Sequence, residues 1–168
     1  MPEFKFGLFT SFVFFLWMVL VYTIIVPNFY GAGEFIMFVS VFIPTIGIFL
    51  GIKERRDKSN FGHITYREAF RSGIVITFII SVMIVIFTYV YYEFINPDYV
   101  NFLIAKSEKS MIADNVPREQ INAALTVTRY QFSLNVQIIQ QLLFVLIGGS
   151  VISAVLAFIL KKEKRSKN

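Results

Sequence analysis

The chain has 168 residues, of which 56% are hydrophobic and only 16% charged, and its formal net charge is +5. Soluble domains carry about 25% charged residues, so this composition excludes an ordinary soluble domain. The chain has no cysteine, which excludes disulfides, thiolate metal sites and cysteine nucleophiles.

Four long apolar segments contain no acidic residue, basic residue or histidine, and they cover residues 6–26, 35–52, 74–92 and 134–160. A helix needs about 20 apolar residues to cross the hydrocarbon core, at a rise of about 1.5 Å per residue. Each segment reaches or nearly reaches that length. The sequence therefore predicts an all-α integral membrane protein with four transmembrane helices. The first segment is interpreted as a retained anchor, because its apolar run is longer than the roughly 7–15 residues of a signal peptide.

The positions of Lys and Arg predict how the spans are oriented, because cytoplasmic loops carry an excess of both. Twelve of the 16 belong to the N-terminal stub, the 53–73 loop or the tail after Leu160, and four lie in the 93–131 loop. We therefore expect both termini and the 53–73 loop in the cytoplasm, the 93–131 loop outside, and one membrane domain over residues 1–168. Because topology explains the positive charge, a nucleic-acid partner is not expected.

Three spans carry small residues at four-residue spacing, which allows two helices to approach closely. These residues are Gly47 and Gly51 in the second span, Gly73, Thr77 and Ser81 in the third, and Gly149 and Ser153 in the fourth. Packing within one bundle and packing in a homodimer both use such faces. We favour packing within the bundle, and the sequence does not set the oligomeric state.

The 53–73 loop combines a turn with a helix start. Residues 59–62 have turn chemistry, and Gly62 is free to adopt a positive φ. Thr65 and Glu68 have the spacing of a capping box, in which each side chain bonds the backbone N–H of the other residue. The pattern predicts a helix that begins at Tyr66 and continues into the third span.

The 93–131 loop is too long for a simple connector. Asn96 followed by Pro97 is typical of a cap and a first helical residue, and Pro117 is expected to open a second helix. Residues 114–116 interrupt the apolar periodicity between them. The loop therefore predicts an extracytoplasmic helical hairpin between spans three and four, whose second helix runs into the fourth span.

The spans offer little chemistry, because none contains an ionisable residue. The lone His63 has neither a cysteine nor a pair of carboxylates near it in sequence, so no metal site is predicted. The sequence also shows no nucleophile–base set and no phosphate-binding loop, so no catalytic residue and no cofactor are predicted. Three amides open the fourth span: Gln137, Gln140 and Gln141. They could line a polar vestibule or hydrogen-bond a neighbouring helix, and we favour the second role.

Charged residues of the 53–73 loop form the candidate docking site for lipid headgroups or for another membrane protein. They are Arg55, Arg56, Asp57, Lys58, Arg67 and Arg71. Asp57 lies amid cations before a turn and a capped helix, which suggests a defined surface with Arg56 and Asp57 paired. The alternative is a basic loop that serves orientation alone.

The stretch from Gly51 to Gly73 resembles the signature of a family of small bacterial membrane proteins, the domain of unknown function 4199, found mainly in Bacteroidota. The residues that carry the resemblance are Gly51, Ile52, Lys53, Arg56, Asp57, Gly62, Ile64, Thr65, Ala69, Phe70, Arg71 and Gly73. The similar layout extends to the Asn96–Pro97 pair, the helix start at Pro117 and the basic tail. The resemblance implies four helices in the bacterial inner membrane and no established activity.

The leading functional hypothesis is a non-enzymatic accessory or interaction subunit, whose partners are the lipid bilayer and another membrane protein. One alternative is a component of a carrier or channel with an uncharged polar path at the Gln137–Gln141 end. A second alternative, by analogy of fold alone, is a helper of a polyprenyl-phosphate glycosyltransferase.

Overall fold

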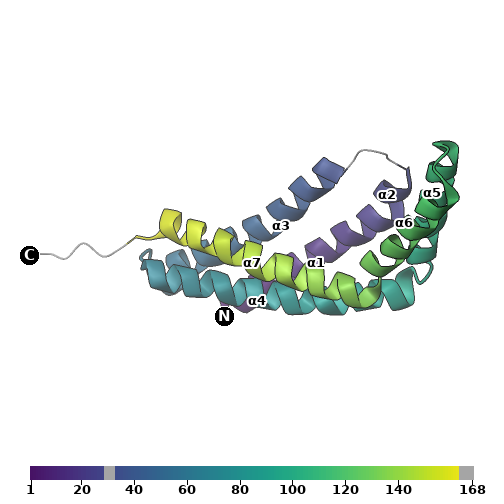
Figure 1. The fold of residues 1–168 in the computed structure, drawn as a ribbon. Helices are drawn as coiled ribbons and strands as arrows, with labels where there is room; N and C mark the ends of the chain where they lie inside the picture. Colours follow the sequence, from purple (N-terminus) through teal and green to yellow (C-terminus); the bar gives the residue numbers. More distant parts are fainter. Residues whose placement is uncertain (29–32, 163–168) are drawn as a thin grey trace, which may run out of the picture. The chain divides into compact units, whose positions relative to one another are not determined.

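The computed structural model describes residues 1–28 and 33–162, and this part of the chain is almost entirely helical (Figure 1). Three of the helices end in a five-residue π-helical segment, which shifts the register of the residues that follow. The elements are α1 (Pro2–Leu20) with its π-helical segment Val21–Ile25, α2 (Val26–Asn28), α3 (Gly33–Glu54) with Arg55–Ser59, α4 (Tyr66–Val90) with Tyr91–Ile95, α5 (Tyr99–Ala113), α6 (Arg118–Gln131) and α7 (Leu134–Leu160).

Three helical stretches in the described chain are long and apolar enough to cross a membrane. They are Pro2–Asn28, Tyr66–Ile95 and Leu134–Leu160, with mean hydropathies of 2.3, 2.6 and 2.7. The all-α class expected from the sequence is therefore confirmed, and these three stretches support the multi-pass membrane class by their length and composition. The second predicted segment falls in the 22-residue helix α3, which contains Pro44, and its role as a span stays a prediction.

The chain packs into two compact units, and the first comprises residues 1–84 together with the chain from Leu142 onward. Its core lies where α3, α4 and α7 meet, and contains side chains that are almost completely buried, such as Ile48, Ile76, Ile80 and Ala157. Large apolar side chains also face outward, including Phe9 on α1 and Ile147 on α7, each 65% exposed. A helix that is apolar on both its packed and its exposed face is typical of a membrane span.

Small residues let the helices of this unit approach one another, as the four-residue spacing predicted. Gly47 of α3 lies against Thr10 of α1. Gly73 of α4 lies so close to α7 that an added Cβ would be 2.6 Å from the Ser153 hydroxyl oxygen. Because these contacts lie within one chain, the role of the small residues in internal packing is confirmed.

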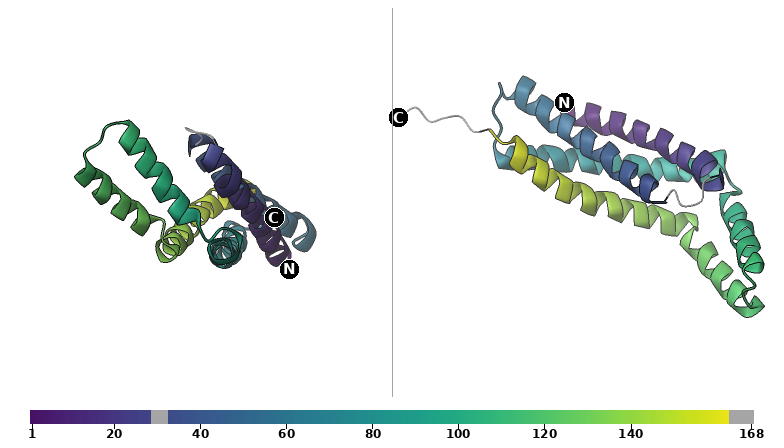
Figure 2. Two further views of the ribbon diagram at one scale, coloured as in Figure 1. Left: turned by 90° about the vertical axis from the view of Figure 1, so that its right-hand side faces the viewer. Right: turned by 90° about the horizontal axis from the view of Figure 1, so that it is seen from above.

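The second unit, Val85–Gln141, comprises the end of α4, the helices α5 and α6 and the start of α7. The helices α5 and α6 contact each other and are joined by a short turn (Figure 2). Arg118 at the start of α6 pairs with Glu108 of α5 at 2.9 Å. The aromatic rings of Tyr91, Tyr92 and Tyr99 pack edge to face, with centroids about 6 Å apart. The prediction of one domain over residues 1–168 stays a prediction.

Two helix boundaries in this unit differ from the prediction. The helix α5 begins at Tyr99 and not at Pro97, because Asn96 and Pro97 belong to a turn in which the Asn96 side chain donates to the Tyr91 hydroxyl at 3.1 Å. The helix α6 does begin immediately after Pro117, but it ends at Gln131 and does not run into α7. The Ser133 hydroxyl donates to the Tyr130 carbonyl at 2.7 Å in the break between the two helices.

Candidate functional site

A tight turn follows the π-helical end of α3, and we call residues 59–64 the Phe61 turn. The Gly62 N–H donates to the Arg56 carbonyl at 2.8 Å, and the Asn60 N–H donates to the Arg55 carbonyl at 3.0 Å. These two hydrogen bonds cap the C-terminal end of the helix. Gly62 has φ +81°, as the sequence predicted, and Phe61 also has a positive φ, +52°. The Phe61 conformation was not predicted, because an aromatic residue rarely adopts the left-handed region.

The far side of the turn is attached to the end of α7. Ile64 and Lys162 form an isolated antiparallel bridge, with reciprocal N–H to carbonyl hydrogen bonds of 2.9 and 2.8 Å. Ile64 is 1% exposed and belongs to the core of the first unit. The turn is therefore held at both ends, by the helix before it and by α7. The remaining tail cations used to predict orientation, Lys164, Arg165 and Lys167, lie outside the described residues.

The predicted capping box is present at the start of α4. The Thr65 N–H donates to the Glu68 carboxylate at 2.9 Å, and the Glu68 N–H donates to the Thr65 hydroxyl oxygen at 3.3 Å. The first helical residue is Tyr66, so the predicted helix start is confirmed. The two bonds satisfy backbone donors that the first turn of a helix would otherwise leave unpaired.

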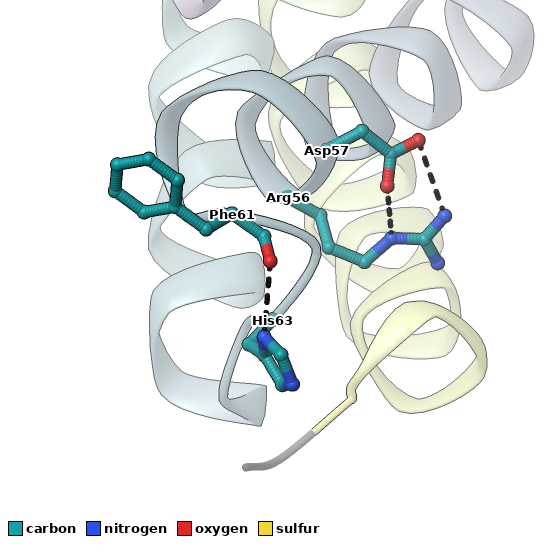
Figure 3. Close-up of polar contacts among 4 residues, drawn as sticks. All are labelled: Arg56, Asp57, Phe61 and His63. Carbon is teal, nitrogen blue, oxygen red and sulfur yellow. Dashed lines mark hydrogen bonds and ion pairs between the residues drawn. The ribbon is translucent and has the colours of Figure 1, made fainter.

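Arg56 and Asp57 are paired as expected. The Arg56 Nε donates to Asp57 Oδ1 at 2.7 Å and one terminal nitrogen donates to Oδ2 at 3.3 Å, so the planar guanidinium meets the carboxylate with two bonds (Figure 3). The hydrogen bond from Arg56 lowers the pKa of the Asp57 carboxyl, and the positive charges of Arg56, Lys53 and Lys162 lower it further. Asp57 is thus one acid surrounded by the cations of α3 and of the chain end after α7.

A buried ionic contact that the sequence did not reveal joins α1 to the end of α3. Glu3 is only 4% exposed, and its Oε1 accepts hydrogen bonds from the Arg55 guanidinium and from the Ser72 hydroxyl, the latter at 3.0 Å. The Arg55 Nε is buried without a hydrogen-bond partner. An available signal was that Glu3 is the only acid before the first apolar segment.

The six predicted docking residues therefore have different surroundings. Arg55 points inward to Glu3, and Lys58 lies 3.5 Å from the Glu54 carboxylate in the same helical stretch. Arg67 and Arg71 are exposed on α4, and in the described part of the chain neither forms an ion pair. Only Arg56 and Asp57 form a planar two-bond pair, so they are the most specific part of this set.

The predicted amides at the start of α7 are engaged in local hydrogen bonds. The Gln141 side-chain oxygen accepts from the Thr88 hydroxyl of α4 at 2.9 Å, and the Gln137 amide donates to the Gln131 carbonyl at 3.0 Å. Gln140 is exposed. The contact between Gln141 and Thr88 is an interhelical hydrogen bond. The choice between a packing role and a vestibule for the three amides stays a prediction.

Comparison with protein families gives a match over nearly the whole chain. Residues 5–162, from the first turns of α1 to the bridge residue Lys162, match a family described as Protein of unknown function (DUF4199). The chain belongs to this family. No curated protein and no solved structure matches it.

In this DUF4199 protein, the Phe61 turn and the start of α4 enclose an open hollow of about 490 Å³. Its lining is mixed in chemistry, and consists of Asn60, Phe61, His63, Ile64, Thr65, Glu68 and Lys162. The His63 ring nitrogen Nδ1 lies 3.1 Å from the Phe61 carbonyl oxygen (Figure 3). Across the described residues, no group of three His, Asp or Glu side chains is placed to hold a metal ion. Polar groups that line the hollow can form hydrogen bonds with a bound molecule, and Lys162 adds one positive charge.

Proposed function

We propose that this DUF4199 protein is a non-enzymatic accessory subunit of the bacterial inner membrane, and that it acts through an interaction at its 53–73 loop. The observation that carries the proposal is the construction of this loop. A topogenic loop needs positive charge but no fixed conformation. Here the Phe61 turn is closed by backbone hydrogen bonds, attached to α7 through Ile64 and followed by a capped helix.

The proposal includes four spans, with α3 as the second, both termini in the cytoplasm and the α5–α6 pair outside. Support for α3 comes from its exposed apolar face, on which Phe35, Phe38, Phe42, Ile46 and Leu50 recur at helical spacing. An exposed row of this size would be unfavourable in water and is suited to lipid.

Single cysteines test this topology, because the chain has none of its own. Ser59 and Ser110 are both exposed, one in the Phe61 turn and one near the end of α5. Ser59→Cys should react with a membrane-impermeant thiol reagent only from the cytoplasmic side, and Ser110→Cys only from the outer side. Reaction of both from the same side would refute the four-span arrangement.

The interaction itself is tested with Arg56→Lys. This substitution keeps the positive charge but removes the planar guanidinium that forms two hydrogen bonds with Asp57. Arg67→Lys is the matched control, because Arg67 is exposed and makes no ion pair in the described chain. Each variant is purified in mild detergent, and the amount of each co-purifying membrane protein is compared with that of the wild type. A hot spot costs about 2 kcal/mol or more, or about a 30-fold loss of affinity.

We expect that Arg56→Lys loses a partner which Arg67→Lys retains. The opposite result is that Arg56→Lys behaves as the wild type while removal of any two charges weakens recovery equally. In that case the loop serves orientation alone, and the proposal of a specific interaction fails.

A further inference from the structure

Phe61 adopts a backbone conformation that is unfavourable for an aromatic residue. Its φ of +52° is in the left-handed region, where an aromatic side chain is disfavoured and glycine is the usual residue. Its side chain is 86% exposed, so burial within the chain does not offset that cost. Backbone strain of this kind clusters at sites that contact other molecules, so a contact outside the chain accounts for the conformation of Phe61.

The turn holds the Phe61 ring in a defined position. The Gly62 N–H bonds the Arg56 carbonyl at 2.8 Å, and the His63 N–H bonds the Asn60 carbonyl at 3.1 Å. Ile64, three residues after Phe61, is fixed to Lys162 by the bridge. Figure 3 shows the Phe61 ring pointing away from Arg56 and Asp57, while its carbonyl oxygen faces His63. The ring is therefore presented outward by a closed turn.

The bridge also places Phe61 near the boundary of the apolar surface. Phe158 and Ile159, in the last turn of α7, are each 65% exposed, so the lipid-facing surface of this span continues almost to its end. Lys161 then lies over the Phe158 ring, with 4.6 Å between its Nζ and the ring centroid. Three residues of chain span at most about 10 Å, so Phe61 lies close to the bridge and hence to this boundary.

Exposed cations occur at the same boundary. Lys53 lies in the last turn of α3, Lys161 and Lys162 follow α7, and Arg67 and Arg71 lie on the first turns of α4. Aromatic rings are favoured at the headgroup level of a membrane, and cations near the ends of spans are attracted to an anionic leaflet. A protein partner would instead need an extended complementary surface around Phe61.

We propose that Phe61 inserts between anionic phospholipids of the cytoplasmic leaflet, with these cations at the lipid phosphates. The inference rests on the proposed placement of the 53–73 loop in the cytoplasm, and it names anionic phospholipid as the ligand of Phe61, beside the partner proposed at Arg56. The Phe61 turn then fixes the end of α3 and the start of α4 at the level of the headgroups.

The experiment replaces the natural fluorophore with one at the turn. Trp17 is the only tryptophan, so a Trp17→Phe variant has no tryptophan fluorescence. Phe61→Trp or Ser59→Trp is then added to this variant, one at a time. Ser59 is exposed in the same turn and serves as the matched control. Each protein is reconstituted in nanodiscs of phosphatidylethanolamine with phosphatidylglycerol, or of phosphatidylcholine alone. Quenching is measured with lipids brominated near the headgroup and with acrylamide in water.

Insertion by about 5–10 Å should make the tryptophan at position 61 about twofold more sensitive to brominated lipid, and about twofold less sensitive to acrylamide, than that at position 59. This difference should be large with phosphatidylglycerol and small with phosphatidylcholine. Equal acrylamide quenching at both positions would overturn the insertion. An equal effect in both lipids would overturn the requirement for anionic lipid.

Phe61→Gly separates this inference from the proposed function. Glycine adopts the left-handed conformation readily, so the melting temperature should stay the same or rise. If the tryptophan at position 61 is in water and Phe61→Gly loses a co-purifying protein, Phe61 contacts a protein and the lipid inference fails. The accessory role is then still judged by Arg56→Lys, whose result does not depend on lipid quenching.

Discussion

Alanine in place of glycine should have opposite effects at two positions of the first unit, Gly47 in α3 and Gly148 in α7. A Cβ added to Gly47 would lie 2.6 Å from Thr10 Cγ2 and 2.8 Å from Thr10 Cβ. Real Cβ atoms do not approach other heavy atoms so closely, so α1 or α3 would have to shift. A Cβ added to Gly148 would meet no heavy atom within 4 Å.

The magnitudes follow from two effects. Alanine stabilises a helix relative to glycine by about 0.5–1 kcal/mol, and this gain applies at both positions. Overpacking costs about 1–3 kcal/mol, and it applies only at Gly47. Gly148→Ala should therefore raise the free energy of unfolding by about 0.5–1 kcal/mol. Gly47→Ala should give a value about 1–3 kcal/mol below that of Gly148→Ala.

Trp17 provides the assay, because its Nε1 donates to the Ser40 hydroxyl at 3.0 Å and so joins α1 to α3. Its fluorescence during thermal unfolding in detergent reports the separation of the two helices that Gly47 holds close. Thr10→Ala removes Oγ1 and Cγ2, the two Thr10 atoms nearest to the added Cβ, and should recover part of the loss in the Gly47→Ala background. Equal melting temperatures for the two alanine variants would show that the α1–α3 contact does not depend on a small residue at position 47.

Two further predictions concern polar contacts. Thr65→Ala removes the oxygen that accepts from the Glu68 N–H, and should cost about 1 kcal/mol of local helix stability. Amide exchange at Arg67 and Glu68 should become faster while the rest of α4 stays protected, and unchanged exchange would exclude the cap as the cause of protection. Glu3→Gln keeps the shape of the buried side chain but removes the negative charge that pairs with the Arg55 guanidinium. The substitution should lower the free energy of unfolding by about 1–3 kcal/mol. In a double-mutant cycle with Arg55→Gln the two losses should overlap, whereas additive losses would refute the coupling.

The features that follow from local sequence were predicted well. Long apolar segments gave the positions of the helices because the membrane requires length and hydrophobicity together. The Thr65–Glu68 box depends on residues three positions apart, and the Arg56–Asp57 pair on adjacent ones. Such contacts need no knowledge of the tertiary fold.

The features that the sequence did not reveal depend on distance along the chain or on strain. Glu3 and Arg55 are 52 positions apart, and their contact requires α1 and α3 to be packed. The left-handed conformation of Phe61 opposes the usual preference for glycine, so local propensity points away from it. The start of α5 was misplaced by two residues because an Asn96 side chain can also bond a nearby hydroxyl, here that of Tyr91.

The bridge between Ile64 and Lys162 has a consequence for biosynthesis. The two residues are separated by 98 positions, and synthesis at about 5–20 residues per second needs about 5–20 s to cover that length. Until α7 has been made and has joined α4, the segment at Ile64 lacks the partner that fixes its far end. A ribosome-bound intermediate that ends before α7 should therefore show proteolytic cleavage at residues 59–64, and completion of the chain should abolish it.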